Sequence, residues 1–266
     1  MTEPSRIQSL FGRLRQQKRA ALIAYVTGGD PTGNHTPEWI AALERGGADV
    51  IELGVPFSDP IADGPVIQRG SDRALKGGAT VAKVLDIARR VRENSSIPLI
   101  LFTYLNPVLR YGLAALARDA KAAGVDGCLL TDVSVEEAGT YVDAMRAAGL
   151  DTVFLAAPTS TRRRLELVAE YSSGFVYLVS RTGVTGEQTA VSLALGPLVA
   201  SMRAVTTQPL CAGFGISTPE QARQVAHMTD GVVVGSAIVR LIEQGAGAGE
   251  LEEFARSLRQ GMDRTE

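Results

Sequence analysis

The stretch ERGGADVIEL at residues 44–53 leads from the end of a helix, through glycine, into a short apolar strand. The same pattern returns as KAAGVDGCLL at residues 121–130 and as RAAGLDTVFL at residues 146–155. In each copy a glycine just past a helix suits the left-handed conformation that closes a helix, and an aspartate then precedes the strand. We interpret these glycines as scaffold in a chain that alternates helices with strands.

Further apolar runs extend this alternation along the chain. Strands are expected at Ala20–Thr27, Val50–Leu53, Leu99–Tyr104, Gly127–Thr131, Thr152–Ala156, Phe175–Val179, Leu210–Ala212 and Gly231–Val234. Helices are expected at Pro37–Gly46, Val81–Glu93, Leu113–Gly124, Val135–Gly149, Thr161–Ser172, Leu195–Val205 and Pro219–Met228. Strands that are apolar throughout are buried on both faces, as in a parallel sheet covered by helices.

Eight such units in 266 residues, with no break in composition, favour one α/β domain over residues 1–266, a closed (β/α)₈ TIM barrel. An extra helix at Arg6–Gln17 could plug the bottom of this barrel, and a short phosphate-binding helix is expected after the eighth strand. The alternative is an open doubly wound sheet. That fold would call for a GxGxxG turn after the first strand, where the chain reads TGGDPTG at residues 27–33.

The composition excludes several functional classes. With 45% hydrophobic and 21% charged residues the chain is an ordinary globular protein, and its net charge of −2 offers no general field for nucleic acid or membrane lipid. The first twenty residues hold no continuous apolar stretch, so neither a signal peptide nor a membrane span is expected there. We expect a cytoplasmic protein in which Cys128 and Cys211, each within an apolar run, are buried thiols.

Active sites of such barrels lie at the carboxyl ends of the strands. The second strand leads into IELGVPFSDPIADGPVIQRG at residues 51–70, where Glu52 is flanked by two apolar residues. Partial desolvation there would raise its pKa toward the range useful for acid–base catalysis. A salt bridge is the plainer interpretation, but it does not explain the three prolines between Pro56 and Pro65. Asp63 is a weaker candidate, because aspartate in an Asp-Gly pair usually serves the turn.

Glycine-rich turns follow the last three strands. They read SRTGVTGE at residues 180–187, GFGIS at 213–217 and VGSAIV at 234–239. Backbone N–H groups of such turns and of a helix start bind phosphate, and barrels often hold phosphate after strands seven and eight. The turns therefore predict a sugar-phosphate substrate held by Gly186, Gly215, Gly235 and Ser236.

Two common chemistries lack their residues. A Schiff-base aldolase needs a lysine at a strand end, and none of Lys18, Lys76, Lys83 and Lys121 occupies one. A metal site is not expected either, because the two histidines, His35 and His227, lie far apart in the sequence. Any carbon–carbon cleavage must then use the substrate as its own electron sink, as an indole ring protonated on the carbon that bears the side chain would be.

These motifs together resemble those of tryptophan synthase α subunits. The resemblance is carried by IELGVPFSDPIADGPVIQ at 51–68, and by AYVTGGDP at 24–31, TYLNPVLRYG at 103–112, AAPTST at 156–161, YLVSRTGVTG at 177–186 and GFGISTPEQ at 213–221. It covers essentially the whole chain. It implies a lyase that cleaves indole-3-glycerol phosphate by retro-aldol chemistry to indole and glyceraldehyde 3-phosphate.

The resemblance also implies roles for single residues. Glu52 would be the acid–base catalyst, and Asp63 would bind the indole N–H and stabilise the cationic intermediate. Thr185 would lie in a loop that closes over the substrate and touches Asp63, with Gly186, Gly215, Gly235 and Ser236 on the phosphate. Tyr177 would line the site near Glu52. The remaining positions would line or adjoin the indole pocket: Tyr25, Phe102, Tyr104, Leu129 and Phe214.

By the same resemblance the partner is a β subunit that carries pyridoxal phosphate, in an α₂β₂ assembly, while this chain itself binds no cofactor. Asp59 and the segment Asn106–Gly112 would meet that partner, near Ser134, where the family usually has proline. Three alternatives remain. They are a stand-alone indole-3-glycerol phosphate lyase, a phosphate-sugar isomerase barrel that should lack Asp63 and an apolar pocket, and a degenerate barrel that only activates a partner enzyme.

Overall fold

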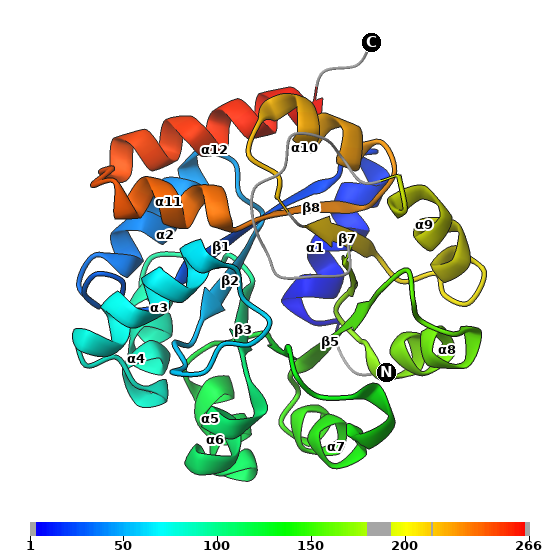
Figure 1. Ribbon diagram of the computed structural model, residues 1–266, viewed down its shortest axis with the longest axis horizontal. Coiled ribbons are helices and arrows are strands. Elements are labelled where there is room, and N and C mark those ends of the chain that lie inside the picture. Colours follow the sequence, from blue (N-terminus) through cyan, green and yellow to red (C-terminus); the bar gives the residue numbers. More distant parts are fainter. Residues whose placement is uncertain (1–3, 180–192, 214, 264–266) are drawn as a thin grey trace.

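The computed structural model describes residues 4–179, 193–213 and 215–263. Within these residues eight parallel strands pair in sequence order, and the last pairs with the first to close a barrel inside a ring of helices (Figure 1). The strands are Ala21–Thr27 (β1), Val50–Gly54 (β2), Leu99–Thr103 (β3), Gly127–Leu130 (β4), Asp151–Ala156 (β5), Val176–Val179 (β6), Leu210–Gly213 (β7) and Gly231–Val234 (β8). The predicted (β/α)₈ barrel is confirmed, and the open sheet was the wrong alternative.

The helices of the described residues alternate with these strands. They are Arg6–Gln16 (α1), Thr36–Arg45 (α2), Pro65–Lys76 (α3), Val81–Arg92 (α4), Leu105–Tyr111 (α5), Leu113–Ala122 (α6), the 3₁₀ turn Val135–Glu137 (η1), Gly139–Ala147 (α7), Arg162–Tyr171 (α8), Leu195–Arg203 (α9), Pro219–Ala226 (α10), Ser236–Glu243 (α11) and Ala248–Asp263 (α12). None of them combines the length and the apolar character that crossing a membrane requires.

Both faces of the strands are buried, which explains their apolar runs. On β1, Leu22 and Val26 pack outward in the main core, while Ile23 belongs to a second core inside the barrel. On β2 the outward Ile51 and Leu53 leave Glu52 facing inward. A strand covered on both sides has no polar face to alternate with its apolar one.

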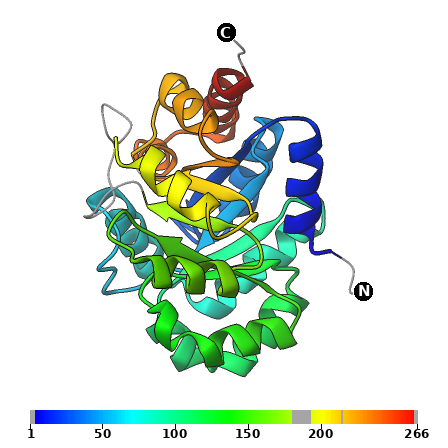
Figure 2. The ribbon, with the colours of Figure 1, turned by 90° about the vertical axis from the view of Figure 1, so that its right-hand side faces the viewer.

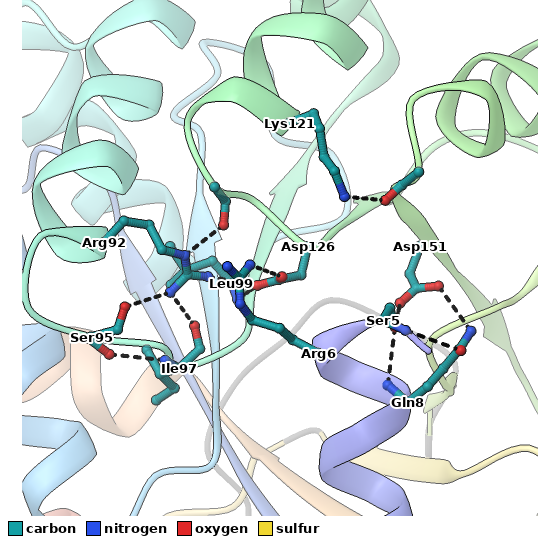
Figure 3. Close-up of polar contacts among 12 residues, drawn as sticks. Ser5, Arg6, Gln8, Arg92, Ser95, Ile97, Leu99, Lys121, Asp126 and Asp151 are labelled. Carbon is teal, nitrogen blue, oxygen red and sulfur yellow. Dashed lines mark hydrogen bonds and ion pairs between the residues drawn. The ribbon is translucent and has the colours of Figure 1, made fainter. Parts of the chain in front are cut away.

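The helix α1 plugs the bottom of the barrel, as predicted, and lies across one end of it (Figure 2). Its buried residues Ile7, Leu10, Phe11 and Leu14 join the core inside the barrel. Polar contacts fasten the start of this helix (Figure 3). Arg6 pairs with Asp126 at 2.7 Å, and Ser5 donates a hydrogen bond to Asp151.

The repeated helix–glycine–strand pattern has the conformation that the sequence predicts. Gly47, Gly124 and Gly149 have φ of 104°, 82° and 68°. The aspartate of the pattern has a further task at the barrel bottom. Asp49 accepts a hydrogen bond from the amide of Leu22 at 2.8 Å, and Asp126 accepts one from that of Leu99 at 2.8 Å. Each carboxylate thus satisfies an N–H group at the start of the preceding strand.

The sequence was wrong about one helix and missed others. The segment Val135–Gly149 is not continuous, because the amides of Glu137 and Ala138 bond three residues back, to Ser134 and Val135, and form η1 before α7 starts at Gly139. The helices α3, α5 and α12 were not predicted. Cys128 and Cys211 are buried free thiols, as expected.

Candidate functional site

A cavity opens among residues at or near the carboxyl ends of the strands, with about 440 Å³ of space not filled by atoms, counting open solvent. Among the described residues its lining is Tyr25, Glu52, Asp63, Ile67, Phe102, Tyr177, Gly215, Val233, Gly235 and Ser236. It brings together two carboxyl groups, an apolar wall and the start of a helix. This is the position at which barrels of this kind place their active sites.

Glu52 lies inside β2 with 1% of its surface exposed. Its Oε1 atom has no hydrogen-bond partner among the described residues. Burial raises the pKa of this carboxyl to about 8, because it removes the charge from water and no described residue offsets that cost. Near neutral pH the group is therefore mostly protonated, and it can donate a proton into the cavity.

Asp63 enters the cavity from the loop between β2 and α3 and is 5% exposed. Burial raises its pKa to about 6, while a hydrogen bond from the Tyr104 hydroxyl lowers it. Its carbonyl oxygen also accepts a hydrogen bond from the Gln68 side chain at 2.8 Å, which ties it to α3. Near neutral pH Asp63 is mostly ionised. Glu52 is thus protonated and Asp63 ionised, which suits a proton donor and a carboxylate that stabilises positive charge, respectively.

Aromatic and aliphatic side chains form the apolar wall. The rings of Tyr25 and Phe102 meet edge to face, with centroids 5.2 Å apart and an interplanar angle of 78°. Ile67 from α3 and Val233 from β8 add aliphatic surface. Such a wall suits a flat apolar ring, with a few polar groups fixing its orientation.

Gly215, Gly235 and Ser236 line the cavity where α11 begins, at Ser236. The first amides of a helix have no partner within the helix, and the helix dipole is positive at this end. Gly215 has φ of 76°, a conformation that side chains disfavour. These features make this end of the cavity suitable for an anion.

Most of the site residues named from the sequence come together here. Tyr104 and Leu129 do not line the cavity: Tyr104 supports Asp63, and Leu129 is fully buried inside the barrel. Thr185, Gly186 and Phe214 lie outside the described residues. The sequence missed Ile67 and Val233. Ile67 falls within the stretch 51–70 already singled out, whereas the run GVVV of β8 gives no sign of which valine faces inward.

In the described residues, histidine, cysteine, aspartate and glutamate nowhere gather in groups of three or more that could hold a metal ion. The lysines Lys76, Lys83 and Lys121 lie in the outer helices α3, α4 and α6, and Lys18 follows α1. Among the described residues that line the cavity, Glu52 and Asp63 are the two carboxyl groups.

The family model described as tryptophan synthase alpha chain matches residues 11–264. The tryptophan synthase alpha chain of Solibacter usitatus is 63% identical over 262 residues, covering 97% of this chain and 98% of that one. The alpha chain of Geobacter sulfurreducens is 48% identical over 261 residues, with 97% and 99% covered.

Solved structures agree with these relatives. A structure of Mycobacterium tuberculosis tryptophan synthase superimposes with a TM-score of 0.92 at 39% identity, covering 99% of this chain and 100% of that chain. Tryptophan synthase subunit alpha from Legionella pneumophila gives a TM-score of 0.88 at 35% identity, with 98% and 99% covered. The sequence and structure comparisons therefore both lead to tryptophan synthase, over nearly the full length of the chain.

Proposed function

This chain belongs to the tryptophan synthase alpha chain family and is a lyase that cleaves indole-3-glycerol phosphate, and we propose that Glu52 and Asp63 perform this cleavage in the barrel cavity. The observation that carries the proposal is the pair of buried carboxyls in one cavity, with pKa values of about 8 and about 6. One is protonated and the other ionised near neutral pH, so the cavity holds both a proton donor and a negative charge.

In the proposed mechanism Glu52 donates its proton to the indole carbon that bears the glycerol phosphate chain. The ring becomes cationic, and ionised Asp63 accepts a hydrogen bond from the ring N–H and stabilises the positive charge. Glu52, now a carboxylate, accepts the proton of the adjacent hydroxyl. The carbon–carbon bond then breaks, its electrons return to the ring, and indole and glyceraldehyde 3-phosphate are released. Glu52 ends protonated again, ready for the next cycle.

The remaining groups of the cavity would orient the substrate. The edge-to-face pair of Tyr25 and Phe102, with Ile67 and Val233, would hold the indole ring. Tyr177 would lie near Glu52, because both residues line the cavity and because burial, followed by the Glu52 charge, raises the pKa of Tyr177. The phosphate would bind at Gly215, Gly235 and Ser236, together with Gly186, which lies outside the described residues.

We further propose a partner, the β subunit of an α₂β₂ assembly in the cytoplasm, which would carry the pyridoxal phosphate. Two large apolar side chains support this proposal: Ile61, before α3, is 76% exposed, and Leu109, on α5, is 59% exposed. Ile61 lies in the loop that carries Asp59, after β2, and Leu109 lies after β3, so both follow carboxyl ends of strands. Ser134 has φ of −63°, the value that proline fixes, so serine there leaves the backbone as the family's proline would have it.

The test is release of indole from indole-3-glycerol phosphate, measured with and without a β subunit. The isolated chain should release indole, and the β subunit should raise the rate at least tenfold, a coupling of about 1.4 kcal/mol. A chain that is fast alone and indifferent to the β subunit would favour the stand-alone lyase. A chain that releases no indole under either condition would contradict the proposed function.

A further inference from the structure

The two helices that begin at the cavity, α3 and α11, lie against each other on one side of the barrel (Figure 1). Asp63 stands two residues before α3 and is tied to it by Gln68. Ser236, at the anion end, is the first residue of α11. The distance between the two helices therefore sets the distance between the Asp63 carboxyl and the anion-binding end of the cavity at Ser236.

One ion cluster joins the far parts of the two helices. Glu243 is the last residue of α11. Arg69 of α3 donates hydrogen bonds to both of its carboxylate oxygens, at 2.6 and 2.8 Å. Arg73, one turn further along α3, reaches the same carboxylate at 2.8 Å. A glutamate at the carboxyl end of a helix opposes the helix dipole, so Glu243 depends on these arginines. The hydrogen bonds from Arg69 lower its pKa to about 2, which keeps it ionised.

Arg73 also anchors the cluster to the barrel. Its Nε and Nη2 atoms donate hydrogen bonds to the carboxylate of Asp30 at 2.8 and 2.7 Å. Asp30 follows β1, and only 1% of its surface is exposed. Arg73 is thus shared between a buried carboxylate of the barrel and the end of α11. A lysine at this position has no planar fork with which to hold both partners.

The two helices approach each other closely at Gly70. A Cβ atom on Gly70 would lie 2.9 Å from Val239 of α11 and 3.1 Å from both Asp30 and Thr27. Val239 packs with Val66, Ile67 and Tyr25 in a small apolar cluster, and the last two line the cavity. A shift of α3 against α11 would therefore move the cavity wall as well as Asp63.

We propose that Arg73 and Glu243 are positioning residues, which hold Asp63 and the anion-binding end of the cavity at the distance that the substrate requires. This inference rests on the proposed function. Misplacement of about 1 Å costs catalysis up to about 10²-fold. Loss of the tie between the helices should therefore affect substrate binding and catalysis more than it affects folding.

The chain offers a matched control for this tie. Glu252 of α12 also forms ion pairs with two arginines, Arg45 at 2.8 Å and Arg256. Its side chain is 22% exposed, which is close to the 26% of Glu243. It joins α12 to α2, and it is absent from the lining of the cavity. Glu243→Gln and Glu252→Gln therefore remove comparable charges, but only the first removes a tie between the two ends of the cavity.

The affinity for glycerol 3-phosphate, measured by calorimetry, should fall about tenfold in Glu243→Gln, and KM for indole-3-glycerol phosphate should rise with it. Arg73→Lys should show the same pattern, together with a shifted pH profile of kcat/KM as Asp63 moves. Glu252→Gln should keep the original affinity and KM. If the two glutamine variants bind glycerol 3-phosphate equally well, the inference is overturned and the cluster serves stability alone.

The same measurements separate this inference from the proposed function, because calorimetry requires no turnover. An unaltered chain that binds glycerol 3-phosphate but releases no indole would contradict the function and leave the tie in place. An unaltered chain that releases indole while Glu243→Gln keeps its KM would contradict the tie alone. Failure of the unaltered chain to bind the ligand would overturn the anion site and this inference with it.

Discussion

The hydroxyl of Tyr104 donates a hydrogen bond to the carboxylate of Asp63 and accepts one from the neighbouring amide of Ala62 at 3.1 Å. The Tyr104 ring also packs against Phe57 of the same loop, with centroids 5.3 Å apart. Tyr104 is 2% exposed and comes from the end of β3, a rigid part of the barrel. Tyr104, a residue of the barrel scaffold, thus holds the loop between β2 and α3 so that the Asp63 carboxyl lies in the cavity.

Tyr104→Phe should raise the pKa of Asp63, because the hydrogen bond that favours the ionised form is lost. Asp63 would then stay protonated up to a higher pH, so the acid limb of the pH profile of kcat/KM should move to higher pH. The control is Tyr111→Phe, which removes a similar hydrogen bond, to Asp119 at 2.8 Å, between α5 and α6. An acid limb that moves equally in both variants, or in neither, would contradict the role given to Tyr104.

The stability of the protein should depend on pH through Glu52. Its pKa is about 8 in the folded chain against an ordinary value of 4.5, so between these values the folded state binds the extra proton. The contribution of Glu52 to stability therefore falls as pH rises through this window, by about 1.4 kcal/mol for each unit of the pKa shift, and this contribution changes no further above about pH 8.

Glu52→Gln removes this dependence, so its melting temperature should exceed that of the unaltered chain increasingly from pH 5 to pH 8. Thermal unfolding followed by circular dichroism at several pH values measures the difference. Glu170→Gln, on the exposed part of α8, should show no such trend. A constant difference between Glu52→Gln and the unaltered chain would mean that Glu52 is ionised in the folded state.

Gly215→Val should raise KM for the substrate by about tenfold or more, because a branched side chain would block the approach of phosphate to the backbone. It also strains a residue with φ of 76°. Gly245→Val is the control for this strain, since Gly245 has φ of 88° with open space around its Cβ position, after α11. Similar KM values in the two variants would remove Gly215 from the anion site.

The partner face should be sensitive to a charge at its exposed apolar residues. Ile61→Asp should weaken binding of the β subunit at least tenfold in a titration, because a charge would be buried against the partner. Asp59→Ala should lose most of the rate gain from the β subunit and keep the basal rate. Met228→Asp, before β8 at the opposite end of the barrel, should leave both properties unchanged. Equal effects of Ile61→Asp and Met228→Asp on β-subunit binding would place the interface elsewhere.

The sequence was sufficient for the barrel because each strand is buried on both faces and therefore apolar throughout. It was insufficient for α3, whose residues include Gly70 and follow a proline-rich loop. This helix is held by tertiary contacts, namely its close approach to Val239 and the pairing of Arg73 with Asp30. The local sequence pattern does not reveal such contacts, because intrinsic helix propensity is weak and tertiary packing overrides it.

The candidate site divides in the same way. Glu52 could be found from the sequence, because a carboxylate between two apolar residues of a strand is conspicuous. Tyr104 and Leu129 were placed near the pocket by resemblance, and only the structure puts both behind the lining, with Tyr104 as the support of Asp63. The tie through Glu243 was not predicted, because it joins residues about 170 positions apart in the sequence.

The most direct test of the catalytic role of Glu52 is the rate of indole formation by Glu52→Gln, compared with the unaltered chain under the same conditions. Glutamine keeps the shape of the side chain but has no proton to donate and no charge with which to accept one. The rate should fall by about 10²–10⁴-fold or more, because one group serves both proton transfers, while the fold is retained in circular dichroism. A variant that keeps a third of the original rate would show that Glu52 is not the acid–base catalyst.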